Sequence, residues 1–188
     1  ALQRARHLSP LSVKSGSAPL LGPRRARITP RDGTPGDVEF GSAIITTGSV
    51  PNLLPVTGVD LPQVLTSEQV LEIDHLPKRL AVIGAGPIGV EMAQILAAFG
   101  TRVTLLEAGP RILAPVDEEI ALALEDHIRR QGIALELGAR IAAIVRDGDE
   151  VRMQYRDAAG TQREAQAEFV LEATGRRPNV DGLGLEHT

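Results

Sequence analysis

The clearest pattern along the chain is a set of short, largely aliphatic runs in its central part. Residues 80–83, 103–106 and 133–137 are such runs, and a glycine or a charged residue bounds each of them. Continuous aliphatic runs of this length are typical of strands that are buried on both faces of a parallel sheet. The pattern therefore predicts three strands of a parallel sheet in this part of the chain.

Helices are predicted between these strands. Residues 87–99 have a proline in the first turn, where it is tolerated, and Gly100 follows in place to end the helix. Asp117 is placed to cap a second helix, which Gly132 ends. Apolar residues on this helix repeat at the spacing of a single face, at Ile120, Leu124 and Ile128.

After residue 137 the pattern changes from helical to strand-like. Residues 141–146 and 151–155 flank a turn at 147–149 and predict a hairpin. A second turn follows at 157–160, and a last strand begins at Phe169. The predicted order is βαβαβ followed by an antiparallel β-meander, so the expected fold class is α/β with a Rossmann-like parallel sheet.

The first part of the chain is less regular. Residues 1–26 mix Arg, Ser, Pro and Gly with little periodicity, which predicts a loop or a poorly ordered terminus. Residues 27–29 and 38–40 flank Asp32-Gly33 and predict a hairpin. Residues 43–46, Ala-Ile-Ile-Thr, are largely apolar and predict a short buried strand.

The segment that joins these two parts contains prolines and little periodicity. Residues 50–63 predict an extended connector. Thr66 and Gln69 then stand at the spacing of a capping box, which predicts a short helix that continues to about Ile73.

Composition limits the classes of function. The 188 residues include 20 basic and 24 acidic side chains, and the net charge of −4 argues against a nucleic-acid partner. No apolar run approaches the ~20 residues of a membrane span, and the first residues lack the apolar core of a signal peptide. We therefore expect a soluble, cytoplasmic protein without a membrane partner. The absence of cysteine excludes disulfides, thiolate metal sites and cysteine nucleophiles.

One motif carries chemistry. The segment Gly84-Ala85-Gly86-Pro87-Ile88-Gly89 fits the pattern G-x-G-x-x-G and lies between a predicted strand and a predicted helix. In this pattern the first glycine permits a tight turn, the second lets a pyrophosphate approach the backbone, and the third lets the helix pack on the strand. Exposed N–H groups and the positive end of the helix hold the phosphates.

An acidic residue strengthens this interpretation. Glu107 ends the second predicted strand, 18 residues after Gly89. A carboxylate at this point accepts hydrogen bonds from the adenosine ribose and repels a 2′-phosphate, so it favours NAD over NADP. Arg102 and Arg111 are nearby cations that could bind a 2′-phosphate, but we interpret them as solvated surface charges.

Other candidates are weaker. Glu91 lies in the first turn of the predicted helix, where a carboxylate is stabilised by the helix N-terminus. The four histidines have no metal-ligand spacing, and they are His7, His75, His127 and His187. The sequence therefore predicts no metal site and no catalytic residue within this chain.

Three separated blocks together resemble the pyridine nucleotide–disulfide oxidoreductases, a family of FAD- and NAD(P)-dependent flavoproteins. The first block is Ala43 through Pro51, which resembles the family's "ATGS.P" crossing between its two domains. The second runs from Arg79 through Glu107 to Gly132, and the third, Leu171 through Asn179, resembles the "ATGRRPN" return segment. The resemblance covers about residues 27–188.

The resemblance implies roles for individual residues. The segment 84–89 would bind the NAD pyrophosphate, and Glu107 the ribose. Three further residues match positions that touch the nicotinamide end or line the cofactor cleft, namely Glu91, Ile141 and Gly175. The family's contacts with FAD are matched by Thr47, Gly48 and Ser49. A further FAD contact is matched by Ala18.

The resemblance also implies that the chain is an interior piece of a longer protein. Residues 1–50 would be a partial FAD-domain segment, 51–175 the NAD-binding domain with its connector, and 176–188 a return segment. In this family the FAD-binding motif and the redox-active cysteine pair lie upstream, and a dimerisation domain lies downstream. The intact protein would therefore be a homodimer that acts on a disulfide-type acceptor, whereas this chain alone would be catalytically incomplete.

Two residues depart from the family pattern. Thr46 replaces the usual Ala of the first block, and Glu172 stands where the family prefers an aliphatic residue in a buried strand. Because burial of an unpaired carboxylate is costly, we expect the Glu172 side chain to face solvent.

Two alternatives to an NAD-binding flavoprotein domain remain open on the sequence. One is a flavin-free NAD-dependent dehydrogenase, for which the chain offers no evident substrate domain after Glu107. The other is a non-enzymatic dinucleotide-binding module.

Overall fold

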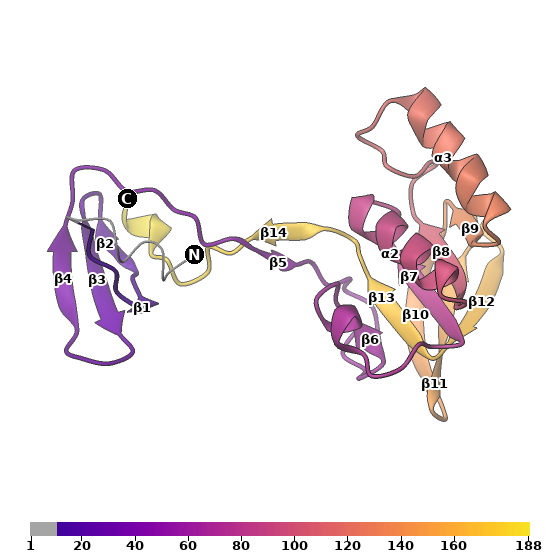
Figure 1. Ribbon diagram of the computed structural model, residues 1–188, viewed down its shortest axis with the longest axis horizontal. Coiled ribbons are helices and arrows are strands. Elements are labelled where there is room, and N and C mark those ends of the chain that lie inside the picture. The colour runs from indigo at the N-terminus through magenta and orange to yellow at the C-terminus, as the bar shows by residue number, and fades with distance from the viewer. Residues whose placement is uncertain (1–10) are drawn as a thin grey trace. The chain divides into compact units, whose positions relative to one another are not determined.

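The computed structural model describes residues 11–188, and these form two compact units (Figure 1). One unit combines the described part of Ala1–Ser49 with Pro178–Thr188, and the other is Val50–Arg177.

The larger unit is built on a five-stranded parallel sheet. The strands follow the spatial order β6-β13-β7-β8-β9, and every neighbouring pair is parallel. Their bounds are β6 Val64–Leu65, β7 Arg79–Ile83, β8 Arg102–Glu107, β9 Ala134–Leu137 and β13 Phe169–Glu172. The predicted βαβαβ unit is therefore confirmed, and the last predicted strand returns to the sheet beside the first strand of that unit.

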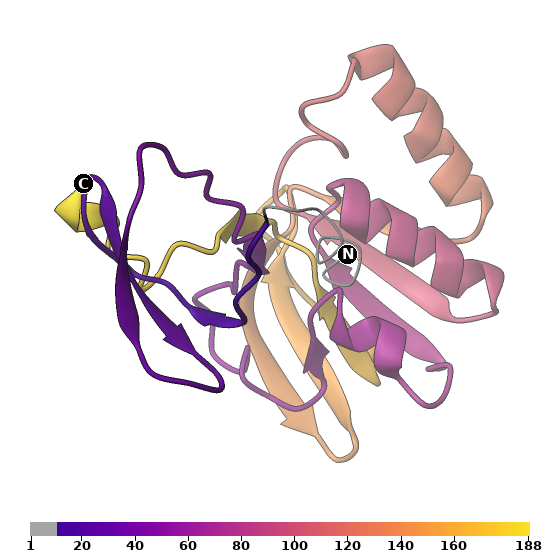
Figure 2. The same cartoon turned by 60° about the vertical axis from the view of Figure 1, so that its left-hand side comes forward.

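Two helices and a meander cover the two faces of this sheet (Figures 1 and 2). The helices α2 (Pro87–Ala98) and α3 (Glu118–Arg130) lie on one face. The predicted antiparallel meander lies on the other and is confirmed as a separate three-stranded sheet. Its strands are β10 Arg140–Asp147, β11 Glu150–Arg156 and β12 Gln162–Ala167.

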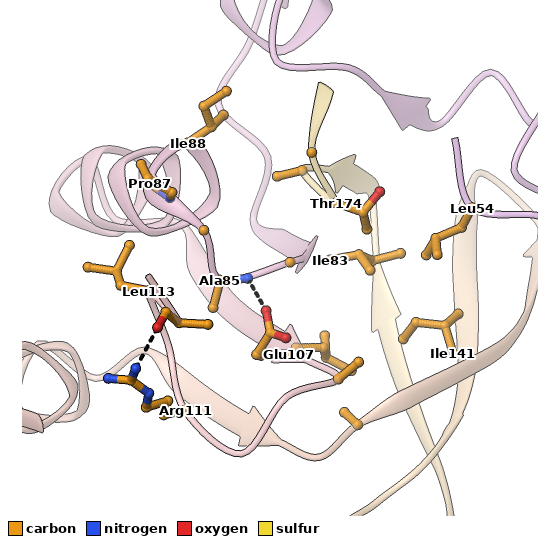
Figure 3. A pocket seen from close by; sticks show the side chains of 18 of the residues that line it. Leu54, Ile83, Ala85, Pro87, Ile88, Glu107, Arg111, Leu113, Ile141 and Thr174 are labelled. Carbon is orange, nitrogen blue, oxygen red and sulfur yellow. Dashed lines mark hydrogen bonds between the residues drawn. The ribbon is translucent and has the colours of Figure 1, made fainter. Parts of the chain in front are cut away.

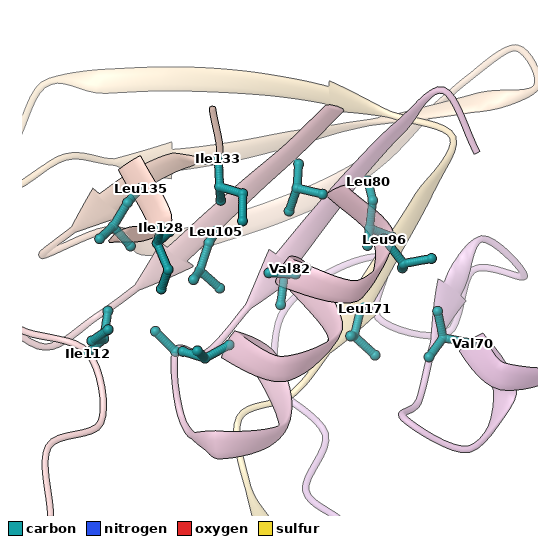
Figure 4. Packing of buried hydrophobic residues seen from close by; sticks show 14 of the residues in the cluster. Val70, Leu80, Val82, Leu96, Leu105, Ile112, Ile128, Ile133, Leu135 and Leu171 are labelled. Carbon is teal, nitrogen blue, oxygen red and sulfur yellow. The ribbon is translucent and has the colours of Figure 1, made fainter. Parts of the chain in front are cut away.

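The helix-covered face holds a core of aliphatic side chains (Figure 4). Leu80, Val82 and Leu105 of the sheet pack against Leu96 of α2 and Ile128 of α3. Because the strands are covered on both sides, their residues are buried in sequence without alternation, as the continuous aliphatic runs predicted.

The predicted apolar face of α3 is partly wrong. Ile120 is 60% exposed, whereas Ala121, Glu125 and Ile128 are buried. The buried stripe therefore repeats at Ala121, Leu124 and Ile128, and Ile120 lies outside it. A small residue such as Ala121 carries little hydrophobic signal, although the helix approaches the sheet there.

The connector has little regular structure, as predicted. It contains the short strand β5 (Ser49–Pro51) and leads through β6 to the 3₁₀ helix η1 (Gln69–Glu72). The two hydrogen bonds of the predicted capping box form, because Thr66 Oγ1 accepts from the N–H of Gln69 at 3.3 Å and Gln69 Oε1 accepts from the N–H of Thr66 at 2.9 Å. The 3₁₀ helix itself begins only at Gln69, with Glu68 as its N-cap.

The smaller unit is an antiparallel sheet of four strands with β3 at its centre. The strands are β1 Gly16–Ser17, β2 Leu20–Gly22, β3 Arg25–Pro30 and β4 Gly36–Glu39. The predicted hairpin is confirmed as β3 and β4. The described part of residues 1–26 differs from the loop prediction, because β1 and β2 are strands of two or three residues, too short to give a period.

Both ends of the described chain build this unit. The 3₁₀ helix η2 (Leu185–His187) follows residues that meet β2, and the N–H of Leu20 donates to the carbonyl of Leu183 at 2.7 Å. The strand β14 (Arg176–Pro178) pairs with β5 as a two-stranded sheet.

The predicted buried strand at residues 43–46 is wrong. These residues have no strand structure, and the side chain of Ile44 is 90% exposed. An apolar run becomes a buried strand only where another strand pairs with it, and the described residues supply no such partner here.

No helix of the described residues is both long and apolar enough to span a membrane.

Candidate functional site

A pocket lies at the carboxyl ends of the parallel strands of the larger unit (Figure 3). Its volume is about 460 Å³, within the range of roughly 300–1,000 Å³ that is usual for small-molecule sites. Ile83 of β7, Glu107 of β8 and Ala173, directly after β13, contribute to its lining. Ligands of open α/β sheets bind at this edge of the sheet.

The glycine-rich segment forms the junction between β7 and α2. Gly84 has a φ of +99°, and a Cβ there would lie 2.5 Å from the carbonyl oxygen of Ala173. A Cβ on Gly89 would lie 1.9 Å from the carbonyl oxygen of Gly84. Gly86, in contrast, has open space where its Cβ would be. The first and third glycines are thus required by close packing, and the second leaves room at the pocket.

The same junction presents the N-terminus of α2 to the pocket. The helix begins at Pro87, with Gly86 as its N-cap, and both residues line the pocket together with Ile88. The N–H groups of the first helical turn have no acceptor within the helix, and the helix dipole adds positive charge. This end of α2 therefore suits an anion such as a phosphate.

Glu107 lies at the end of β8 with its carboxylate turned toward this junction (Figure 3). Its Oε2 accepts from the N–H of Ala85, and its Oε1 from the N–H of Gly109, each at 2.7 Å. A carboxylate oxygen can accept more than one hydrogen bond, so both oxygens keep acceptor capacity. The two contacts fix the carboxylate beside the glycine-rich segment.

The structure brings most of the residues predicted to contact NAD into this one pocket. Those that line it are Gly84, Ala85, Gly86, Pro87, Ile88, Glu107, Ile141 and Gly175. Gly89 packs behind the junction instead. Glu91 is exposed in the second turn of α2, not the first, and belongs to a separate shallow depression on that helix.

Arg111 is not the solvated surface charge that the sequence predicts. Arg111 lines the pocket (Figure 3), and its guanidinium donates to the carbonyls of Ala114 and Val116, the latter at 2.9 Å. These contacts close the loop after β8 around the arginine. Arg102 is exposed, in agreement with the same prediction.

The loop after β8 is the part of the pocket that the sequence did not indicate. Leu113 has a φ of +46°, which is uncommon for a residue with a Cβ, and its N–H donates to the carbonyl of Ala85 at 2.9 Å. Glu125 of α3 is buried and accepts from the N–H of Ile112 at 3.1 Å. A helical side chain thus anchors a loop that lies against the glycine-rich segment.

Glu172 is buried, so the prediction that it faces solvent is wrong. Its side chain is 3% exposed, and Oε1 accepts from the N–H of Leu54 and, at 3.2 Å, from the hydroxyl of Thr174. Burial raises the pKa of this carboxyl, and the two hydrogen bonds act in the opposite direction. The cost of burial is met in part by these donors, which a pattern of apolar positions does not reveal.

The residues predicted to contact FAD lie outside this pocket. Thr47 and Gly48 contact the return segment, since Thr47 Oγ1 donates to the carbonyl of Asn179 at 2.6 Å and the N–H of Asn179 donates to the carbonyl of Gly48 at 3.0 Å. Ser49 begins β5, and Ala18 is exposed between β1 and β2.

Among residues 11–188, no group of three or more His, Asp or Glu side chains could hold a metal ion. His7 lies outside the described residues.

Comparison with known proteins extends these observations. The model of the pyridine nucleotide-disulphide oxidoreductase family matches residues 19–188. Dihydrolipoyl dehydrogenase 3 of Pseudomonas aeruginosa is 40% identical over 173 residues, which make up 91% of this chain and 37% of that protein. Mercuric reductase of Lysinibacillus sphaericus is 37% identical over 142 residues, or 76% of this chain and 26% of that protein.

A solved flavoprotein structure is also similar to this chain. The Cu(II) complex of the HOCl-induced flavoprotein disulfide reductase RclA from Escherichia coli has a TM-score of 0.86 and 27% sequence identity. The matched region covers 100% of this chain and 41% of the RclA chain. This chain therefore spans less than half of the length of each of these relatives.

The fold and the pocket define a Rossmann-like α/β unit with a glycine-rich strand–helix junction. With the match over residues 19–188 the assignment becomes specific: the chain belongs to the pyridine nucleotide-disulphide oxidoreductase family.

Proposed function

We propose that the Val50–Arg177 unit is the NAD(H)-binding part of a dihydrolipoyl dehydrogenase-like flavoprotein, where it positions the nicotinamide for hydride transfer to or from flavin. The observation that carries this proposal is the convergence of the glycine-rich segment, the N-terminus of α2 and the Glu107 carboxylate on one pocket. The bound cofactors supply the redox chemistry, and this unit contributes binding and orientation.

The order of the strands supports one orientation of the dinucleotide. Glu107 ends β8, on one side of β7, and Gly175 follows β13, on the other side. The pyrophosphate would lie at the junction after β7, between them. The adenosine ribose would then contact Glu107, and the nicotinamide half would extend toward Ile141 and Gly175.

The surroundings of Glu107 favour NAD over NADP. A 2′-phosphate would bring negative charge against the carboxylate in a partly buried site, where charge repulsion is weakly screened. The carbonyls of Ala114 and Val116 hold the Arg111 guanidinium in the loop after β8 but leave its charge unchanged, so the preference for NAD rests on Glu107.

The remaining parts of the proposal concern the intact protein. There, Thr47, Gly48, Ser49 and Ala18 would contact FAD, and the protein would be a homodimer that acts on a disulfide-type substrate. This chain has no cysteine, so thiol–disulfide exchange requires groups that it does not carry. Flavin absorbance of the purified chain separates this proposal from a flavin-complete enzyme, since an NAD-binding unit alone has none.

Calorimetric titration with NADH and NADPH tests the proposal. We expect the chain to bind NADH and to prefer it over NADPH. Glu107→Gln should weaken NADH binding by about tenfold and reduce the preference, because the amide nitrogen would face an N–H donor in place of an acceptor. Glu118→Gln, a change of the same kind at an exposed site on α3, is the control. Absence of NADH binding, or a preference for NADPH, would contradict the assignment.

A further inference from the structure

Glu172 is a buried acid that the proposed binding of the dinucleotide does not use. It is the last residue of β13, and its Oε1 accepts from the N–H of Leu54 and from the Thr174 hydroxyl. Its Oε2 is buried and has no hydrogen-bond partner among the described residues. A carboxyl at such a position is costly, so its retention calls for a physical reason.

The two donors of this carboxyl come from separate segments that both line the pocket. Leu54 belongs to the connector, and Thr174 lies just after β13, beside Gly175. Glu172 itself does not line the pocket but lies behind this part of its wall. Two further contacts join the connector to the segment after β13. The N–H of Asn52 donates to the carbonyl of Gly175 at 3.0 Å, and the Thr174 hydroxyl lies 3.4 Å from the carbonyl of Asn52.

This part of the wall lies at the end of the pocket away from Glu107. Glu172 is paired in register with Ile83 of β7, and β7 separates β13 from β8. In Figure 3, Leu54 and Ile141 lie on one side of Ile83 and Glu107 on the other, and Thr174 lies next to Ile83. The proposed orientation puts the nicotinamide half at the end formed by Leu54, Thr174 and Ile141.

We propose that Glu172 is a positioning residue, which holds Leu54 and Thr174 in place as the wall against which the nicotinamide half of the dinucleotide binds. This inference rests on the proposed function and deepens it. An aliphatic side chain at position 172 would bury equally well but would leave the N–H of Leu54 without this acceptor. The connector would then be free to move away from the end of β13, and the wall would lose its shape.

The surroundings of Glu172 influence the protonation state of its carboxyl. Burial raises the pKa of Glu172, and no charged side chain among the described residues pairs with it. By strand alternation its side chain shares the face of Val170, where Tyr155 of β11 is the titratable member of the apolar cluster. Arg79, at the other end of β7, pairs instead with Glu150.

The sign of the pH dependence follows from the raised pKa. In the folded state the ionised carboxylate is disfavoured relative to the unfolded chain, where the usual pKa of a glutamate is 4.5. The protonated carboxyl is therefore fully compatible with the fold below that value. As pH rises from below that value through the raised pKa of the folded state, the folding stability of the chain should fall.

Three variants test the role of Glu172. Glu172→Gln keeps an oxygen acceptor and cannot ionise, Glu172→Leu removes the acceptor, and Glu168→Leu is the matched control. Glu168 precedes β13 and accepts from the N–H of Lys78 at 3.2 Å, so it offers the same kind of contact outside the pocket. The ligands are NADH and ADP, of which ADP carries the adenosine half and the pyrophosphate alone.

We expect Glu172→Leu to bind NADH about tenfold more weakly and ADP as the unchanged chain does. Hydrogen exchange of the Leu54 amide should be faster in this variant only. Glu172→Gln should bind NADH normally, and its folding stability should stay constant over the pH range in which that of the unchanged chain falls. Glu168→Leu should bind both ligands as the unchanged chain does.

Other outcomes overturn either this inference or the proposed function, and they are distinguishable. If the unchanged chain binds neither NADH nor ADP, the proposed function fails. If it binds both, but Glu172→Leu keeps full NADH affinity or loses both ligands equally, Glu172 has no positioning role. Should Glu172→Leu not fold, Glu172→Asp decides, because its shorter side chain withdraws the acceptor from Leu54: unchanged NADH affinity together with faster exchange of the Leu54 amide overturns the inference.

Discussion

At the scale of single residues, the glycines of the β7–α2 junction make different contributions, and substitution can separate them. A Cβ on Gly89 would lie 1.9 Å from a main-chain carbonyl oxygen, whereas one on Gly86 would meet nothing within 4 Å. We therefore expect Gly89→Ala to lower the free energy of unfolding by about 1–3 kcal/mol, the usual cost of overpacking. Chemical denaturation measures this change.

Gly86→Ala should fold as the unchanged chain does, because its φ of −72° suits alanine. It should nevertheless weaken NADH binding, since the added methyl group occupies space at the helix N-terminus where a phosphate would approach the backbone. A stable Gly86→Ala variant with full NADH affinity would show that the phosphates do not bind at this junction.

The sequence indicated those site residues that a local pattern identifies. Gly84 through Gly89 and Glu107 stand at fixed spacings because a strand, a tight turn and a helix repeat the same geometry wherever they occur. Leu54 and Leu113 have no such signal, since only the folded chain brings their segments to the junction. Glu172 was misjudged because its donors lie on the connector and after the strand, and apolar patterning cannot reveal a satisfied buried acid.

At the scale of elements, α3 offers a direct test of which face is buried. Ile128 is fully buried, whereas Ile120 is 60% exposed. Ile128→Ala should lower the free energy of unfolding by about 2–5 kcal/mol, the usual effect of truncating a core aliphatic residue. Ile120→Ala on the same helix should change it by less than about 0.5 kcal/mol. Equal losses in a denaturant titration would show that both residues pack in the core.

Prediction of elements succeeded where burial is symmetrical and failed where it depends on a partner. The strands β7 and β8 are covered by α2 and α3 on one face and by the meander on the other, so an aliphatic run sufficed to indicate them. Residues 43–45 are equally aliphatic, but no described strand pairs with them and they remain irregular. Local composition therefore indicates the tendency to form a strand, while pairing decides the outcome.

At the scale of the whole molecule, the pocket is contained within one compact unit. Every residue that lines it lies between Leu54 and Gly175, inside Val50–Arg177. A fragment of residues 50–177 should therefore fold and bind NADH with the affinity of the longer chain. Circular dichroism and calorimetric titration check the two parts of this prediction. A folded fragment without NADH binding would show that the smaller unit contributes to the site.

The sequence also left the order of the strands open. It indicated the order of elements along the chain but not that β13 enters the sheet between β6 and β7. Both neighbours of β13 pair with it in parallel, which requires the chain to return to the edge beside β7 after the meander. This placement is a property of the completed core, because the return segment alone is compatible with either edge of a sheet.

The insertion of β13 has a consequence for biosynthesis. Until residue 172 has left the ribosome, β6 has no neighbour in the sheet and β7 presents an unpaired edge to the cell. Roughly ninety residues of nascent chain separate β7 from its second neighbour, β13, and their synthesis takes several seconds at usual rates of translation. A premature stop before this strand would leave the edge permanently open, and such products should aggregate or be degraded, not accumulate as smaller folded proteins.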